Sequence, residues 1–256
     1  LSGLVRVRSI TQADAHVFCN MAATESEIKI IWEIVDKFYS TFNLPLKLRL
    51  SLRDPKQPKK YLGEEKFWKD AEAILLRVVK DKKVKYVEAK GEAAFYGPKL
   101  DFMATDSLGR EWQVATIQLD LNMPECFKLT FTNNEGGRSK ILMIHAAIMG
   151  AIERFMSILI EHYAGAFPVW LAPVQVSIIP VSEKFTKYSK SVCEKLQEQD
   201  IRVELNDTNE TLGKRIREAE IQKIPCLLVV GEREQQNKTV SVRRRGNREV
   251  KEMSIE

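Results

Sequence analysis

The chain has few cysteines, few histidines and no apolar run of transmembrane length. Its four cysteines are widely spaced and include no CxxC pair, which argues against a disulfide framework and favours a reducing, cytoplasmic compartment. No signal peptide opens the chain and no segment is apolar for long enough to cross a bilayer, so no membrane partner is expected. Because only His16, His145 and His162 are present, any histidine-based site must use these residues.

The rest of the composition is that of a soluble globular protein. The chain has 256 residues, enough for one large domain or two ordinary ones, with 44% hydrophobic and 29% charged residues. The net charge of +5 is compatible with nucleic-acid binding without demonstrating it. Leu1 is not a natural initiator and leads directly into a strand pattern, so we expect a fragment that begins inside a domain.

Up to residue 168 the pattern predicts an antiparallel α+β sheet with flanking helices, because strands dominate and βαβ spacing is absent. The turn at Asp106–Gly109 predicts a hairpin of the two strands beside it, and Gly136–Gly137 predicts a second turn. Helices are predicted at 25–42, 65–80 and 141–163. Strands are predicted at 45–52, 94–104, 111–120 and 126–132, and a short segment at 84–87 follows the second helix.

After residue 168 strands and helices alternate, which predicts a small and mostly parallel α/β domain. We place the boundary near 168–173, giving domains at 1–168 and 173–256. The expected strands are 174–181, 202–205 and 226–230, the helices are 183–199 and 210–221, and a hairpin over about 234–245 closes the domain.

The N-terminal segment 3–18 alternates like a strand and places polar residues on one face. Arg6 and Arg8 come first, followed by Gln12, Asp14 and His16 at every second position. Such a face suits a polyanionic nucleotide at one end and a small polar substrate, with or without a metal, at the other. An amphipathic surface strand with solvated side chains explains the same alternation.

Two further segments combine polar groups on predicted strands. The run Tyr96-Gly-Pro-Lys99-Leu-Asp101 is either a substrate-binding turn or only a strand entry with a Gly–Pro bend. Gln113, Thr116 and Gln118 gather near one end of a strand, and their neutral groups can bind adenine or ribose edges. Exposed strand residues of no special function are the other interpretation.

The apolar run 141–163 contains His145 and Arg154. A histidine beside apolar residues is more often packed than a ligand, whereas a lone arginine on an apolar helix is rarer, because an unpaired buried charge is costly. A phosphate is a natural partner for Arg154.

In combination these motifs resemble class II aminoacyl-tRNA synthetases, in the form found in the threonyl-tRNA synthetase family. The residues that carry the resemblance are TQADAH (motif 2), FYGPKLD, QVATIQLD, HAAIMGAIER (motif 3) and NETLGKRIR. The resemblance covers nearly the whole chain. It implies an antiparallel-sheet class II synthetase catalytic domain, present in part, followed by a small α/β anticodon-binding domain.

The resemblance also implies a zinc site that reads threonine. His16 and His145 are the implied ligands, and the third, a cysteine, is expected upstream of this chain. Zinc takes the amino and hydroxyl groups of threonine in this family, and Asp14 helps to read the hydroxyl. Cys19 is not expected to replace the missing ligand, since the family has a non-ligand cysteine there too.

Other roles implied by the resemblance concern ATP and the adenylate. Arg6 and Arg154 would clamp the ATP phosphates with Mg²⁺, and Gln113 would bind ATP. Gln12 and Lys99 are the other two residues assigned to catalysis. Tyr96, Thr116 and Gln118 would bind substrate.

The last implied site reads the anticodon of tRNA(Thr). Asn209, Arg217, Glu234 and Arg243 fall on positions that contact anticodon bases in the threonine enzyme, and amides, carboxylates and arginines can read exposed base edges. For 243–245, a solvated charge run is an equal alternative.

The implied function is that of a threonine–tRNA ligase using threonine, ATP and tRNA(Thr), as a homodimer in the full-length protein. The chain departs from the family pattern at Ala146 and Ala151, and it lacks motif 1, the first motif 2 arginine, the zinc cysteine and any editing domain. Because half of the ATP clamp and one zinc ligand are missing, the fragment alone should be inactive. Two alternatives stay open. One is a non-catalytic tRNA-binding or regulatory paralogue, and the other is a class II ligase for another amino acid.

Overall fold

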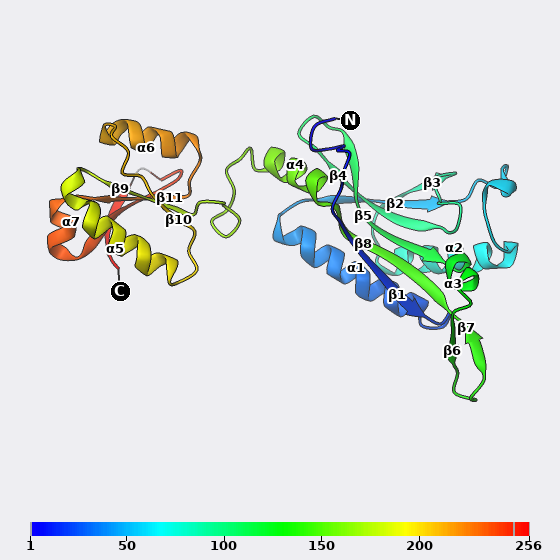
Figure 1. The fold of residues 1–256 in the computed structure, drawn as a ribbon. Helices are drawn as coiled ribbons and strands as arrows, with labels where there is room; N and C mark the ends of the chain where they lie inside the picture. The colour runs from blue at the N-terminus through cyan, green and yellow to red at the C-terminus, as the bar shows by residue number, and fades with distance from the viewer. Residues whose placement is uncertain (1, 248, 256) are drawn as a thin grey trace. The chain divides into compact units, whose positions relative to one another are not determined.

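The computed structural model describes residues 2–247 and 249–255, so Leu1 and Glu256, the outermost residues of the two expected domains, lie outside it. The chain divides into two compact units, Leu1–His162 and Tyr163–Glu256 (Figure 1). Among the described residues, no helix has the length and apolar character needed to span a membrane.

The first unit is built on a six-stranded sheet in the order β1-β8-β5-β4-β2-β3. Neighbouring strands are antiparallel except for the parallel pair β2 and β3, which confirms the predicted antiparallel α+β class. The strand bounds are β1 Gln12–Cys19, β2 Leu46–Leu52, β3 Tyr86–Lys90, β4 Lys99–Thr105, β5 Glu111–Asp120 and β8 Leu142–Ala151. The predicted hairpin is present as β4 and β5.

Two amphipathic helices cover one face of this sheet. Helix α1 (Thr24–Thr41) packs against β5 and β8, and α2 (Glu65–Asp81) packs against β2 and α1. Their buried residues recur at helical spacing, as with Ile28, Ile31 and Val35 on α1. Trp32 meets the ring of Phe102 edge-on, with 5.1 Å between ring centroids. The opposite face of the sheet is left for polar residues.

The long helix predicted at 141–163 is wrong in its first half, which forms β8, and only α4 (Ile152–His162) is helical. The run is apolar at nearly every position, so its hydrophobic residues show neither the two-residue repeat of a half-buried strand nor a clear helical repeat. A strand buried on both faces cannot be told from a helix in such a run. The strand ends at Ala151, one residue after Gly150, whose φ is +64°. A β-carbon there would lie 2.9 Å from the carbonyl oxygen of Val114.

The N-terminal strand is shorter than predicted. Strand β1 begins at Gln12, and the amide of Ser2 donates to the carbonyl of Arg6 at 3.0 Å in a turn. Arg6 and Arg8 therefore do not continue the strand face that carries Asp14 and His16. The alternation misled here because two positively charged residues spaced by two also fit a turn.

Smaller differences concern segments next to turns. The strand predicted from residue 94 begins at Lys99, and the short segment at 84–87 overlaps the start of strand β3 (Tyr86–Lys90). The segment 126–132 is not one strand, since helix α3 (Asn122–Cys126) ends there and β6 (Thr130–Thr132) follows. Strand β6 pairs with β7 (Arg138–Lys140) around the predicted Gly–Gly turn. A short 3₁₀ turn, η1 (Pro58–Lys60), precedes α2.

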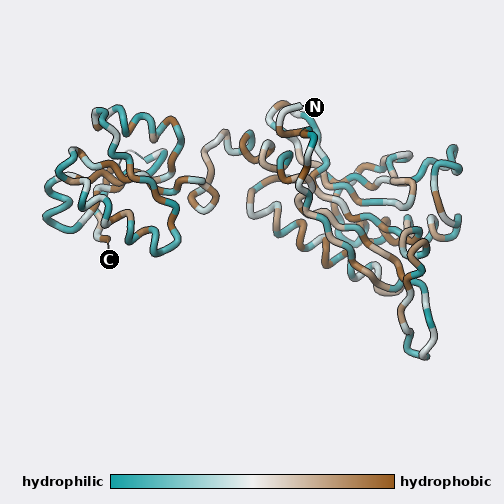
Figure 2. Tube along the Cα trace, viewed as in Figure 1, coloured by the Kyte–Doolittle hydropathy of each residue, from teal (hydrophilic) through white to brown (hydrophobic). Residues whose placement is uncertain are grey.

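The second unit is a five-stranded sheet in the order β10-β9-β11-β12-β13. Strands β10, β9 and β11 are parallel, as predicted, while β12 and β13 are added antiparallel. The bounds are β9 Val176–Pro180, η2 Glu183–Phe185, α5 Thr186–Gln197, β10 Val203–Leu205, α6 Leu212–Ile221, β11 Cys226–Val230, α7 Glu232–Asn237, β12 Thr239–Arg244 and β13 Val250–Ser254. Strands β9 and β11 are the most hydrophobic of these (Figure 2).

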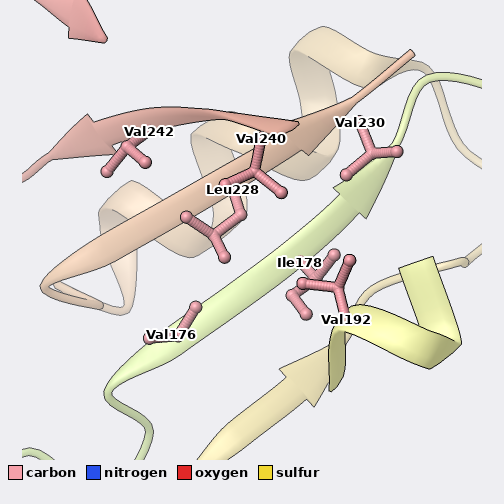
Figure 3. Packing of buried hydrophobic residues seen from close by; sticks show 7 residues of the cluster. All are labelled: Val176, Ile178, Val192, Leu228, Val230, Val240 and Val242. Carbon is pink, nitrogen blue, oxygen red and sulfur yellow. The ribbon is translucent and has the colours of Figure 1, made fainter. Parts of the chain in front are cut away.

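Aliphatic side chains fill the core between this sheet and α5 (Figure 3). Ile178 and Val192 are almost fully buried there beside Leu228 and Val240. Leu227 points to the other face and packs beneath α6 with Ala219.

The closing hairpin predicted over about 234–245 is wrong in its first half. Glu234 lies in α7, and the hairpin is formed by β12 and β13.

Candidate active site

A polar cavity of about 280 Å³ opens on the helix-free face of the first sheet. Its walls come from β1, β4, β5, β8 and the loop before β4. Eight of the residues predicted from sequence line it: Gln12, Asp14, Tyr96, Lys99, Gln113, Thr116, Gln118 and His145. Strand register explains the convergence, because Gln118 lies opposite both Lys99 and His145, and His145 lies opposite His16. These four residues form one row across the sheet.

Two histidines and two aspartates cluster at one end of the cavity, where Asp14 and His145 line it. The rings of His16 and His145 meet edge-on with 4.7 Å between centroids. His145 Nε2 lies 2.9 Å from Asp120 Oδ2, and His16 Nε2 lies 4.0 Å from Asp14 Oδ2. Two adjacent imidazoles of this kind fit a zinc ion as two of its ligands. Within residues 2–247 and 249–255 no cluster of three or more His, Cys, Asp or Glu side chains could hold a metal.

Cys19 does not complete this set. It lies three residues after His16 on β1 and therefore on the other face of the strand. Its Sγ is 3.7 Å from Thr24 Oγ1. Burial raises the pKa of the Cys19 thiol, which disfavours the thiolate that zinc requires.

A buried carboxylate, Asp101, organises the other end of the cavity. It is fully buried and accepts hydrogen bonds from Lys99 Nζ at 3.1 Å and Ser51 Oγ at 2.7 Å. Arg49 lies 3.5 Å away, and Thr116 Oγ1 donates at 3.3 Å. This network holds the Lys99 ammonium in the cavity wall. Asp101 was part of the predicted motif, but its role as the anchor was missed.

A β-bulge brings Gln113 into the same wall as Thr116. Phe102 pairs with Ala115 and Met103 with Gln113, so Val114 is the extra residue on β5. Gln113 therefore shares a face with Thr116 despite their odd spacing, and its amide donates to Thr116 Oγ1. Tyr39 on α1 secures the bulge by donating to the carbonyls of Val114 (3.0 Å) and Ile148 (2.9 Å).

Tyr96 closes over the histidine end. Its hydroxyl donates to Gln118 Oε1 at 3.1 Å, and its ring lies 5.4 Å from that of His145. Burial, with smaller contributions from Asp120 and Asp14, raises the pKa of Tyr96, so the hydroxyl remains a donor at neutral pH. The next residue, Gly97, has no room for a side chain, because a β-carbon would lie 1.6 Å from the carbonyl oxygen of Leu119.

The two arginines predicted to clamp phosphates do not line the cavity. Arg154, at the start of α4, donates to the carbonyls of Val5 (3.1 Å) and Gln113 (3.3 Å) and stacks over Trp112. It therefore ties the N-terminal turn that contains Arg6 to the strand that carries Gln113. Arg154 therefore contacts Val5, the neighbour of Arg6 in the chain, at the end of the site where Gln113 lies.

The four residues predicted to read an anticodon lie on separate elements of the second unit. Asn209 precedes α6 and lines a cavity of about 420 Å³ beyond the carboxyl ends of β9 and β10, where ligands bind in α/β sheets. Arg217 is on α6. Arg243, on β12, lies 3.6 Å from Glu220 of α6. Glu234 is buried and accepts hydrogen bonds from Ser241 Oγ (2.8 Å) and Gly231 N (3.0 Å).

Both units match known families. Residues 1–163 match the family described as tRNA synthetase class II core domain (G, H, P, S and T), and residues 175–256 match the family described as anticodon binding domain. The threonine–tRNA ligase of Caldanaerobacter subterraneus subsp. tengcongensis is 47% identical over 256 residues, which are 100% of this chain and 39% of that protein. The enzyme of Thermotoga neapolitana is 46% identical with the same coverage.

Solved structures agree. A crystal structure described as the RNA binding domain of threonyl-tRNA synthetase from Cryptosporidium parvum Iowa II superposes with a TM-score of 0.94 at 34% identity, over 100% of this chain and 64% of that one. A prolyl-tRNA synthetase from the same organism, at 19% identity and a TM-score of 0.66, shares the fold. The chain spans about two fifths of the length of the curated relatives it matches. It belongs to the class II aminoacyl-tRNA synthetases, with core-domain residues followed by an anticodon-binding domain.

Proposed function

We propose that the chain is part of a threonine–tRNA ligase, which activates threonine with ATP and transfers it to the 3′ end of tRNA. The observation that carries this proposal is the row Lys99, Gln118, His145 and His16 on adjacent strands. Its first three residues line one cavity with a cation, an amide and an imidazole, and the ring of His16 lies against that of His145. The relatives named threonine–tRNA ligase support it at 46–47% identity across the whole chain.

At the histidine end, His16 and His145 would hold zinc, with a third ligand from outside this chain. When bound, zinc would supply a Lewis acid that takes the amino and hydroxyl groups of threonine. Asp14, 4.0 Å from His16, would accept a hydrogen bond from the substrate hydroxyl. Valine lacks that hydroxyl, and a polar site strongly disfavours an analogue that leaves its groups unpaired.

At the other end, the residues suit a nucleotide. Lys99, anchored by Asp101, would stabilise negative charge on the α-phosphate, and Gln12 would help to position the carboxylate. Thr116 and Gln113 would bind the adenylate. Arg6 and Arg154 would clamp the ATP phosphates together with Mg²⁺, so that catalysis consists of positioning and charge stabilisation rather than covalent chemistry.

In the second unit, Asn209, Arg217, Glu234 and Arg243 would read anticodon bases of tRNA(Thr). Arginine and amide side chains suit unstacked base edges. We expect a homodimer in the full-length protein and action in the cytoplasm.

ATP–pyrophosphate exchange tests the proposal, using a longer protein that contains this chain. Threonine-dependent exchange that a zinc chelator abolishes would support it. The His145→Ala variant should lose zinc and exchange, whereas His162→Ala, outside the cavity, should retain both. No exchange with any amino acid, despite folded protein and bound tRNA, would overturn the ligase and favour a regulatory paralogue. The 256-residue chain alone should give no exchange.

A further inference from the structure

Asp120 is the most deeply buried group at the histidine end of the cavity, and sequence reasoning gave it no role. It is fully buried at the end of β5. From its contacts we propose that Asp120 is a positioning residue, which holds His145 as the tautomer protonated on Nε2 and leaves Nδ1 as the lone pair that faces a ligand. The inference rests on the proposed function only where it concerns zinc.

The two oxygens of Asp120 have separate partners. Oδ1 accepts from the backbone amides of Asn122 (2.8 Å) and Met123 (3.0 Å) at the start of α3. Oδ2 lies 2.9 Å from His145 Nε2. A carboxylate only accepts hydrogen bonds, so the imidazole must supply the proton on Nε2.

The ring of His145 is fixed from three directions. Tyr96 and His16 lie 5.4 Å and 4.7 Å from it, centroid to centroid, and Asp120 holds its Nε2 edge. A neutral imidazole with its proton on Nε2 has a single lone pair, on Nδ1. Histidines that bind metals usually donate their other ring N–H to a carboxylate or carbonyl, which sets both orientation and basicity.

The same backbone contacts make Asp120→Asn an informative substitution. The amides of Asn122 and Met123 require an acceptor, so the asparagine oxygen should take the Oδ1 position and the NH₂ group the Oδ2 position. An NH₂ group donates to His145 Nε2. The variant should therefore invert the tautomer with almost no change in shape, moving the ring proton to Nδ1 and removing the lone pair available to a ligand.

Nitrogen-15 NMR of the histidine side chains measures this directly in the 256-residue chain without metal. The chain has only three histidines, and His145→Ala assigns the signal. In spectra of the neutral ring, the unmodified chain should show His145 protonated on Nε2, the nitrogen that lies 2.9 Å from Asp120 Oδ2. Asp120→Asn should show it protonated on Nδ1. Asp106→Asn, a matched change at another buried aspartate, should leave the signal unchanged.

Zinc affinity, measured by chelator competition on the longer protein, gives the second readout. Loss of such a partner typically weakens metal binding about 10–100-fold, so Asp120→Asn should lose affinity by that factor and Asp106→Asn should not. An unmodified chain with His145 protonated on Nδ1 overturns the inference, even if the variant fails to fold. So does an unchanged tautomer in folded Asp120→Asn. A tautomer change in a protein that takes up no zinc supports the positioning role and overturns the zinc site of the proposed function.

Discussion

The two units place most of their candidate residues in opposite ways, with the buried and hydrogen-bonded Glu234 of the second unit as the exception. In the first unit they lie on adjacent strands and bond to one another, so that Lys99, Asp101 and Thr116 form one buried network. In the second unit Asn209, Arg217 and Arg243 lie on a loop, a helix and a strand. Arg243 is 41% exposed at its side chain and has one long ion pair, with Glu220.

The difference matches the roles proposed for the two units. A reaction site has to hold its groups within about 0.5 Å of productive geometry, which needs rigid elements and satisfied partners. A surface that binds single-stranded RNA can let long side chains adjust to the bases, because stacking and charge tolerate small displacements. Substitutions in the first unit should therefore cost stability, and those on the exposed surface of the second should cost binding.

The largest effect is expected at Asp101. Asp101→Ala would leave Lys99 and Arg49 without their buried partner, which costs about 3 kcal/mol of unfolding free energy, the lower end for such pairs because both cations are partly solvated. Denaturant unfolding followed by tryptophan fluorescence reports mainly on the first unit, which contains Trp32, Trp68 and Trp112. A loss below about 1 kcal/mol, typical of a surface pair, would contradict the network.

Tyr39 should come next. Tyr39→Phe removes the donor to two buried carbonyls beside the bulge and should cost about 1–2 kcal/mol. The matched variant Tyr188→Phe, in the second unit, removes one bond from a half-buried hydroxyl to the carbonyl of Thr239 and should cost less. Comparing the two unfolding free energies tests whether the bulge depends on Tyr39, and an equal cost would argue that it does not.

Glu234 connects the comparison to pH. Burial raises the pKa of the Glu234 carboxyl. The hydrogen bonds from Ser241 and from the amides of Glu234 and Gly231 together lower it by more than burial raises it, so the net pKa is below the ordinary value. Its stabilisation is therefore present above the unfolded-state pKa and is lost as the pH falls through the folded-state pKa. Glu234→Gln should cost about 1 kcal/mol at pH 7, and its difference from the unmodified chain should shrink in acid. A difference independent of pH would contradict this assignment.

The smallest effect on stability is expected at Arg243. Arg243→Ala should change the unfolding free energy by no more than about 0.5 kcal/mol, while it weakens binding to an anticodon stem-loop and, if it contacts phosphate, lowers the salt slope by about 1. Lys195→Ala, on α5 and the other face of the sheet, is the matched control and should change neither. Equal losses of RNA affinity in both variants would remove Arg243 from the recognition surface.

Sequence patterns were sufficient to predict secondary structure and fold class where hydrophobic periodicity and turn motifs agreed. The α+β class, the hairpin of β4 and β5, and the parallel order of β9, β10 and β11 all followed from alternation and turn residues. The family resemblance brought eight cavity residues together before their distances were known, and the family match confirms that resemblance. The individual roles of those residues remain predictions.

The failures have local physical causes. The run 142–151 is apolar at almost every position, so nothing in its period distinguished a central strand from a helix. The bulge at Val114 places Gln113 beside Thr116. The bulge is held by Tyr39, which is distant in sequence, and nothing in the pattern around Tyr39 predicted this contact. Asp120 follows Gln118 by two residues on β5, so the shared face was visible, but its contact with His145 depends on strand register that the sequence does not give.

Gly97 limits how this pocket can change over evolutionary time. The carbonyl that leaves no room for its β-carbon belongs to Leu119, between Gln118 and Asp120 on β5. Any other residue at this position would have to displace the strand that carries both of them. The side chains of Tyr96 and Lys99 can be replaced without moving this strand, whereas the glycine between them cannot. The shape of the cavity can therefore be altered through the side chains that line it, but not through the backbone of the turn that presents them.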